Sequence, residues 1–97
     1  MFARLTIMQV DTDRIDEGIE LYGDSVIPAA KSQKGFREIY LLVDRKSGKA
    51  ISIALWDSQE DAIANEKNLY YQEQVLKGIQ FFTKPPIREG YEVVVKA

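Results

Sequence analysis

Four blocks of branched and apolar residues lie along the chain, each bounded by turn residues, as β-strands are. They cover residues 2–10, 36–44, 50–57 and 88–96. Only a short polar turn separates the second block from the third, and its Gly48 can adopt a positive φ. We therefore predict strands at these blocks, with a hairpin between the second and the third.

A helix is predicted between the first two strands. Its apolar residues recur at spacings of four, three and four residues: Ile15, Ile19, Tyr22 and Val26. Thr12 or Asp13 can cap its first turn, because a side-chain oxygen there accepts hydrogen bonds from free backbone N–H groups. Pro28 has no backbone N–H, so the last turn before Gly35 is expected to be kinked or irregular.

A second helix is predicted after the hairpin. It opens at Ser58–Asp61, which has the form of a capping box, and it runs to about Phe81 or Phe82 before Pro85 and Pro86. Spacings of three and four place one stripe along it: Ala62, Asn65, Leu69, Gln72, Leu76 and Ile79. Two amides interrupt this apolar stripe, and buried amides need hydrogen-bond partners. We expect them to line a pocket between helix and sheet, a dimer groove, or the wet edge of the stripe.

The order of these elements is typical of the α+β class. It predicts one ferredoxin-like βαββαβ domain over residues 1–97, with a four-stranded antiparallel sheet and both helices on one face. The sheet is apolar on both sides, since Ile51, Ile53 and Leu55 alternate with Ala54 and Trp56. Two helices cover only one side, so we expect a second copy of the chain to cover the other, giving a homodimer.

Composition excludes several classes of function. The net charge of −2 disfavours nucleic acid and anionic membrane surfaces as partners, and no apolar run is long enough to span a membrane. The lack of cysteine excludes thiol catalysis and disulfides and is compatible with a reducing cytoplasm. The lack of histidine removes the usual base near neutral pH and the commonest nitrogen ligand of zinc and haem iron. No metal site and no cofactor are therefore predicted.

Two segments resemble the antibiotic biosynthesis monooxygenase family. The segment 54–62 is similar to the family's strand, tryptophan, cap and helix, and the segment 81–93 to its final strand and the approach to it. The similarity covers nearly the whole chain. It implies a dimeric α/β barrel and, in some members, cofactor-independent oxygenation of phenols or quinols. The haem-degrading branch carries a histidine on the second helix and an asparagine on the first strand, and both are missing here.

This resemblance implies a small aromatic substrate in an apolar cavity between sheet and helices. The candidate substrate-binding residues are Trp56, Tyr22, Asn65, Leu69 and Gln72. The candidate catalytic residues are Asn65, Tyr40 and Arg4, which could donate hydrogen bonds to a developing oxyanion. Each has a structural alternative: Trp56 as a core anchor, the tyrosines as packing residues, and Arg4 in an ion pair with Glu38 at the dimer seam. The alternative for the whole chain is a non-catalytic small-ligand-binding or structural homodimer.

Overall fold

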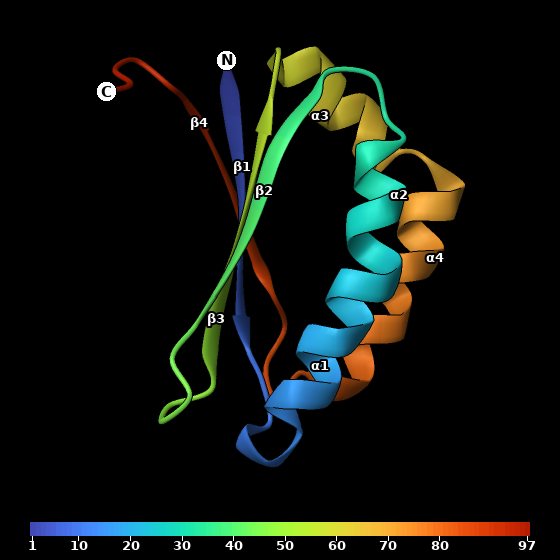
Figure 1. Cartoon of the computed structure of the whole chain (residues 1–97), viewed down its shortest axis with the longest axis vertical. Helices are drawn as coiled ribbons and strands as arrows, with labels where there is room; N and C mark the ends of the chain where they lie inside the picture. Colours follow the sequence, from blue (N-terminus) through green and yellow to red (C-terminus); the bar gives the residue numbers. More distant parts are fainter.

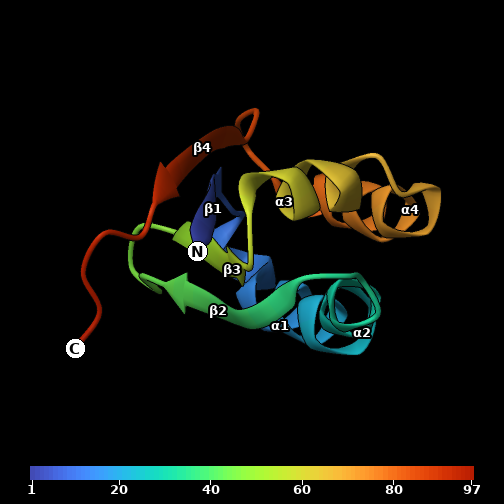
Figure 2. The same ribbon diagram turned by 90° about the horizontal axis from the view of Figure 1, so that it is seen from above.

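A four-stranded antiparallel sheet carries all of the helices on one of its faces (Figure 1; Figure 2). The computed structural model describes residues 1–97. Its strands are β1 (Phe2–Gln9), β2 (Phe36–Val43), β3 (Lys49–Trp56) and β4 (Ile87–Glu92). They lie in the order β2-β3-β1-β4, and every neighbouring pair is antiparallel. This is the ferredoxin-like arrangement, so the predicted fold class is confirmed.

The first helical segment contains a π-helical turn. It consists of η1 (Thr12–Arg14), α1 (Ile15–Leu21), the π turn η2 (Tyr22–Val26) and α2 (Ile27–Lys31). Asp11, and not Thr12 or Asp13, caps its start by accepting from the Asp13 N–H. Pro28 cannot donate a backbone hydrogen bond, and the wider turn directly precedes it. The sequence predicted an irregular last turn, but the irregular turn lies earlier in the segment, at Tyr22–Val26.

The second helical segment is two helices and not one. Ser58 caps α3 (Gln59–Glu66) as predicted, and the segment then breaks before α4 (Leu69–Gly78) and η3 (Ile79–Phe81). Asn68 starts α4, because its side-chain oxygen accepts from the Tyr71 N–H at 3.0 Å. The break changes the phase of the helix, so the stripe predicted beyond Asn65 was wrong. Its later members are exposed: Leu69, Gln72, Leu76 and Ile79.

A β-bulge in β2 changes the face on which Phe36 lies. Phe36 pairs with Trp56 while Glu38 pairs with Leu55, so Arg37 is the extra residue. Unbroken alternation along β2 would place Phe36 and Glu38 on one face, but the bulge places them on opposite faces. The Phe36 ring meets the Trp56 ring edge-on on the helix side, with centroids 5.8 Å apart.

The last strand is shorter than predicted. It ends at Glu92, opposite Phe2, where its partner strand β1 begins. Beyond it only the Val93 N–H bonds back to β1, to the Met1 carbonyl. With no further neighbour to pair with, Val94 and Val95 leave the sheet and are 78% and 84% exposed.

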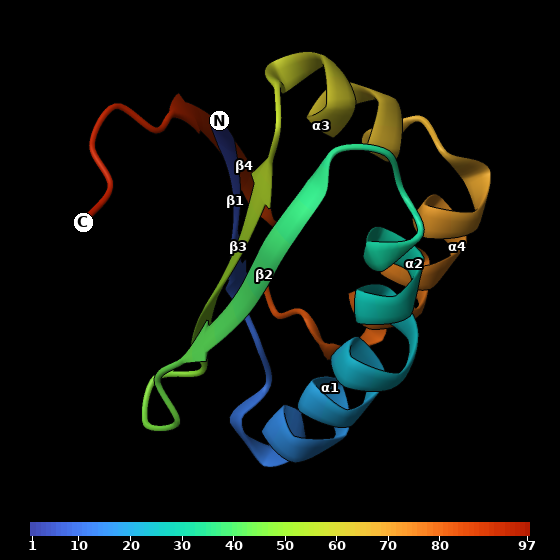
Figure 3. The ribbon, with the colours of Figure 1, turned by 45° about the horizontal axis from the view of Figure 1, so that its top comes forward.

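The core lies between the sheet and the helices, which Figure 3 shows packed side by side over one sheet face. One cluster surrounds Trp56 and contains Phe2, Ala54 and Ala62. The other joins the helices and contains Val26, Ala29, Ala30 and Tyr71, whose small alanines allow α2 and α4 to approach closely. The opposite sheet face is not covered and exposes about half of several large side chains: Tyr40, Leu42, Ile87 and Tyr91. None of the helices is both long enough and apolar enough to cross a membrane.

Candidate active site

A cavity of about 130 Å³ lies between the helix-facing side of the sheet and the helices α1 and α4. Of its 20 lining residues, 14 are hydrophobic. The space exists because small residues face one another there. They are Thr6, Gly18, Ala50, Ser52 and Gly78. A Cβ atom added at Gly78 would meet nothing within 4 Å, so this helix position leaves room beside the cavity.

Tyr22 places a phenol in the cavity wall. It begins the π turn, and its hydroxyl lies 2.5 Å from the Ser52 hydroxyl on β3. Burial and, to a smaller extent, nearby Tyr71 raise the pKa of Tyr22 to about 12, against the lowering effect of the Ser52 hydrogen bond. Tyr22 is therefore a neutral hydrogen-bonding group at physiological pH and not a base.

Tyr71 supplies a second buried phenol. The Asn68 cap fixes the phase of α4 and so directs Tyr71 into the cavity lining. Burial raises the pKa of Tyr71, while the positive charge of Arg88 and a hydrogen bond with Asn65 oppose that shift. Asn65 is only 4% exposed, and its Oδ1 has no hydrogen-bond partner. Asn65 thus reaches the cavity through Tyr71, although it does not line the cavity itself.

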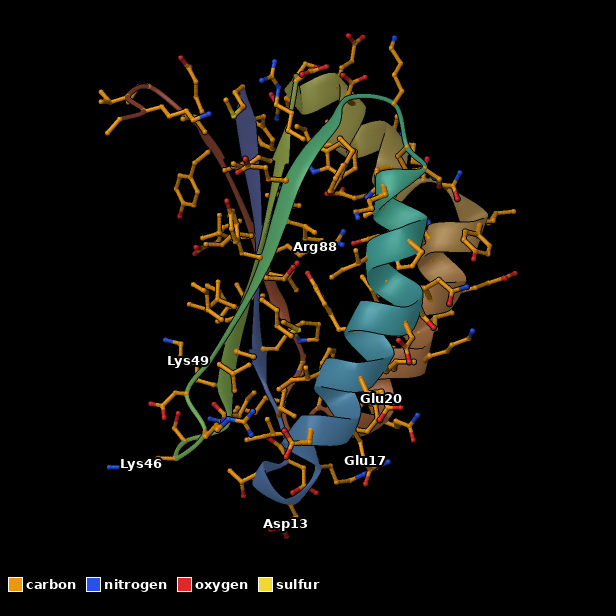
Figure 4. All side chains as sticks on the ribbon, in the orientation of Figure 1. Asp13, Glu17, Glu20, Lys46, Lys49 and Arg88 are labelled. Carbon is orange, nitrogen blue, oxygen red and sulfur yellow. The ribbon has the colours of Figure 1, made fainter.

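Three charged residues meet beside Tyr71. Arg4 of β1 contacts Glu66 at the end of α3, with 2.5 Å between Nε and Oε1. Arg88 of β4 approaches the same carboxylate oxygen, with Nη1 at 3.5 Å, and also lines the cavity. Figure 4 shows Arg88 extending from the sheet toward the helices. Gly90 permits this arrangement, because a Cβ atom there would lie 2.8 Å from Arg4 Nη1. We call Arg4, Glu66 and Arg88 the charged cluster.

The cavity presents hydrogen-bond donors to an apolar interior. Tyr22, Tyr71 and Arg88 can stabilise negative charge that develops on a bound oxygen. The lining contains no carboxylate and no imidazole, so it offers no general base for use near neutral pH. No three acidic side chains gather into a metal site. The arrangement therefore suits binding and polarisation of an apolar molecule that carries an acidic or anionic oxygen.

Solved structures with the same architecture identify the fold. One is SnoaB of Streptomyces nogalater, a cofactor-independent oxygenase, with a TM-score of 0.82, 13% identity and coverage of 98% of this chain and 94% of that chain. Another is a Nitrosomonas europaea protein assigned to the antibiotic biosynthesis monooxygenases, with a TM-score of 0.82, 14% identity and coverage of 98% and 100%. The chain has the antibiotic biosynthesis monooxygenase fold. This confirms the resemblance that the sequence indicated.

The proteins similar in sequence are uncharacterized, so they indicate no activity for this chain. An uncharacterized Mycobacterium tuberculosis protein is 47% identical over 55 residues, which are 57% of this chain and 25% of that protein. A second from the same strain is 35% identical over 60 residues, 62% of this chain and 25% of its own length. The chain thus spans about a quarter of the length of the curated relatives that it matches. No family model matches the sequence.

The structure places the sequence-derived candidates in three different environments. Tyr22 lines the cavity, Asn65 lies next to Tyr71 of the lining, and Arg4 pairs with Glu66, which also contacts Arg88 of the lining. Trp56 lies in the core next to Phe2 and is absent from the cavity lining, which is the structural alternative considered for it. The remaining candidates lie elsewhere.

Four placements require correction. Leu69 is 74% exposed and Gln72 is exposed on α4, with its side chain donating to the Glu66 carbonyl, so neither lines the cavity. Tyr40 lies on the uncovered sheet face, where its hydroxyl donates to Glu38. Arg4 pairs with Glu66 and not with Glu38. Residues paired across adjacent strands point to the same face of a sheet, and Arg4 pairs with Ala54. Arg4 therefore lies on the helix-facing side of the sheet, whereas Glu38 lies on the uncovered side.

The sequence interpretation missed the polar residues that the cavity does contain. Tyr71 and Arg88 line it, and Ser52 bonds Tyr22 across it. The signal for Tyr71 was present, since Asn68 is a good N-cap and a helix restarted there places Tyr71, Val75 and Gly78 on one face. For Arg88 the signal was alternation, because Arg88 and Gly90 share the face of β4 opposite to Ile87 and Tyr91.

Proposed function

We propose that the chain is a cofactor-independent, monooxygenase-like enzyme that oxidises a small phenol- or quinol-type aromatic molecule in this cavity. The observation that carries the proposal is the apolar cavity with the neutral phenol of Tyr22 and the guanidinium of Arg88 in its lining. The fold shared with SnoaB, a cofactor-independent oxygenase, supports it. Fold likeness at 13% identity leaves the reaction to be tested directly.

The proposed reaction needs only electrons that the substrate supplies. In the keto tautomer of the phenol or quinol, the ring CH₂ group beside the carbonyl loses a proton, and the resulting phenolate anion reduces O₂. One oxygen atom then becomes a ring carbonyl and the other leaves as water, so CH₂ and O₂ give C=O and H₂O. The protein's part is to exclude water and to donate hydrogen bonds to the oxyanion from Arg88 and Tyr22. Because the lining holds no base, the proton passes to solvent.

Oxygen consumption with a panel of single-ring quinols, which match the volume of the cavity, tests this proposal. Gly78→Leu adds a side chain at a lining position where a Cβ meets nothing, so it should fill the cavity and reduce uptake at least tenfold. Gly23→Leu is the matched control, since Gly23 is equally unobstructed but lies outside the lining. Leucine has a higher helix propensity than glycine, so neither substitution should destabilise the fold. No uptake above background by the unmodified protein across the panel would reject the enzyme.

A second candidate function is non-catalytic binding of a small ligand by the same cavity. The lack of a carboxylate or imidazole in the lining favours it. Calorimetric binding of panel members that cause no oxygen consumption would select this alternative. Loss of that binding in Gly78→Leu, with retention in Gly23→Leu, would locate it in the cavity.

We also propose that two copies of the chain pair through the uncovered sheet face. Ile87 and Tyr91 of β4 and Tyr40 and Leu42 of β2 are each about half exposed there, which is unusual for a monomer. Leu42→Glu should give a protomer-sized mass in light scattering after gel filtration. Leu69→Glu makes the same chemical change at an exposed site on the helix layer and should leave the dimer intact. A protomer mass for the unmodified chain at micromolar concentration would exclude the dimer.

We further propose a cytoplasmic location for the chain. The lack of cysteine is compatible with a reducing cytoplasm, and cell fractionation tests this prediction.

A further inference from the structure

The charged cluster at the cavity is unbalanced. Arg4 Nε and Arg88 Nη1 lie 2.5 and 3.5 Å from the same atom, Glu66 Oε1. Two guanidinium groups thus share one carboxylate, and one positive charge is left without a partner. The side chains of Arg4 and Glu66 are only 20% and 23% exposed, so solvent screens this charge less than it would at an open surface. The cluster therefore attracts an anion to this end of the cavity.

Arg88 is the arginine that an incoming anion can reach. Its 3.5 Å contact with Glu66 is longer than a charge-assisted hydrogen bond, and its side chain is 37% exposed. Arg4 makes the short contact with Glu66 and also lies over the Phe2 ring, 5.3 Å from its centroid. Arg88 lines the cavity and Arg4 does not, so Arg88 is the arginine that a ligand in the cavity would contact.

The size of the cavity limits the rest of the ligand. Its volume is about 130 Å³, and a dry protein cavity of about 150 Å³ binds benzene. Most of the remaining lining is apolar, with Ile19 and Val75 from the helices and Met8 and Leu41 from the sheet. One aromatic ring, or a branched aliphatic body of similar volume, therefore fits.

We infer that the ligand of this cavity is a small apolar monocarboxylate, with one ring between sheet and helices and its carboxylate on Arg88. The inference deepens the proposed function, on which it rests for the use of this cavity, by giving the substrate an anionic head. The planar fork of an arginine matches the two oxygens of a carboxylate, which a single phenolate oxygen does not use. The Tyr71 hydroxyl lies in the same part of the lining and provides a further donor.

Glu66 sets the strength of this preference. It neutralises one of the two arginines, so the net charge of the cluster is one positive unit. Glu66→Gln keeps the shape of the side chain and an acceptor oxygen at its end, but it removes the competing negative charge. The variant should therefore bind a carboxylate more tightly. A merely structural role of Glu66 would predict the reverse, because damage to the cluster can only weaken binding.

Benzoate and benzamide are the probes, because they match in shape and differ in charge. Titration calorimetry of the full chain should give at least tenfold tighter binding of benzoate. Arg88→Gln should abolish that preference, because it should weaken benzoate binding far more than benzamide binding, and Glu66→Gln should increase the preference at least threefold. Arg45→Gln is the control, because Arg45 pairs only with exposed Asp16 on the surface.

Four outcomes overturn the inference: no binding of either probe, equal binding of both, a preference that survives Arg88→Gln, or a preference that Glu66→Gln weakens in a folded protein. If Glu66→Gln does not fold by circular dichroism, the comparison with Arg88→Gln decides. Oxygen consumption is measured separately. Benzoate preference without oxygen uptake rejects the oxygenase and keeps the inference, whereas uptake with quinols and no benzoate preference does the opposite.

Discussion

Replacement of Trp56 separates its structural role from a role at the site. Trp56 is the largest fully buried side chain, at 1% exposure, and its ring packs on Phe2 and Ala62 and against the edge of Phe36. Trp56→Ala removes all of these contacts and should cost about 3–5 kcal/mol. The total stability of a domain this size is about 5–15 kcal/mol, so the alanine variant should lose at least about 12 °C in Tm.

Trp56→Phe should behave differently because of the indole nitrogen. Trp56 Nε1 is buried without a hydrogen-bond partner, and such a group costs about 1–3 kcal/mol. Phenylalanine keeps most of the ring contacts and removes this N–H. The packing lost with the second ring is of similar size, about 1–3 kcal/mol, so the two effects oppose each other. The net change expected is within about 1 kcal/mol of the unmodified chain.

Urea denaturation followed by circular dichroism measures both variants, since the only tryptophan is lost as a fluorescent probe. Equal destabilisation by phenylalanine and alanine would refute this reasoning, because it would mean that the indole N–H has a partner. Ligand binding gives the second readout. Trp56 is not in the cavity lining, so the folded Trp56→Phe variant should bind the benzoate probe with unchanged affinity. A large loss of affinity at unchanged stability would show that the indole touches the ligand.

Three further predictions concern Tyr22, the α4 cap and two glycines. The pKa of Tyr22 is raised to about 12, so this phenol loses its proton at lower pH in the unfolded chain than in the folded one. Stability should therefore fall as the pH rises from about 10 to 12. Tyr22→Phe should make this fall smaller in a profile of urea midpoint against pH. Asn68→Ala should cost about 1 kcal/mol in the same assay through loss of its hydrogen bond to the Tyr71 N–H, and no change would show that the cap is unimportant. Gly48→Ala should lower Tm, because φ is 78° and the new Cβ would lie 2.2 Å from the Val10 carbonyl oxygen. Gly23→Ala meets nothing within 4 Å and should raise Tm slightly, which makes it the matched control.

Local patterns were sufficient to locate the four strands and the hairpin and to show which residues of β3 share a face. The alternation of apolar residues has a period of two whatever the rest of the chain does. Ser58 was identified as a cap because the accepting hydroxyl of Ser58 and the donating N–H of Asp61 lie within four residues of sequence. The apolar character of both sheet faces was likewise visible in the sequence, and the structure leaves one face uncovered.

Errors arose where one residue changed the phase of an element. The extra residue in β2 moved Phe36 to the helix side, and the restart at Asn68 turned Leu69 outward and Tyr71 inward. Both changes are small in energy and depend on neighbours in space. Phe36 gains contact with Trp56, and Tyr71 gains burial against α2. The bulge could not be anticipated from alternation along β2, whereas the restart had a local signal in the N-cap residue Asn68.

The sequence by itself therefore determined the order of elements, the fold class and the apolar character of the sheet, because these follow from side-chain periodicity along short segments. Only the tertiary structure decided the composition of the site. Arg4, Glu66 and Arg88 come from three elements far apart in the chain and meet because the first and last strands are paired beneath the end of α3. The net positive charge at the cavity therefore depends on the contacts among these three residues, and no spacing along the sequence predicts those contacts.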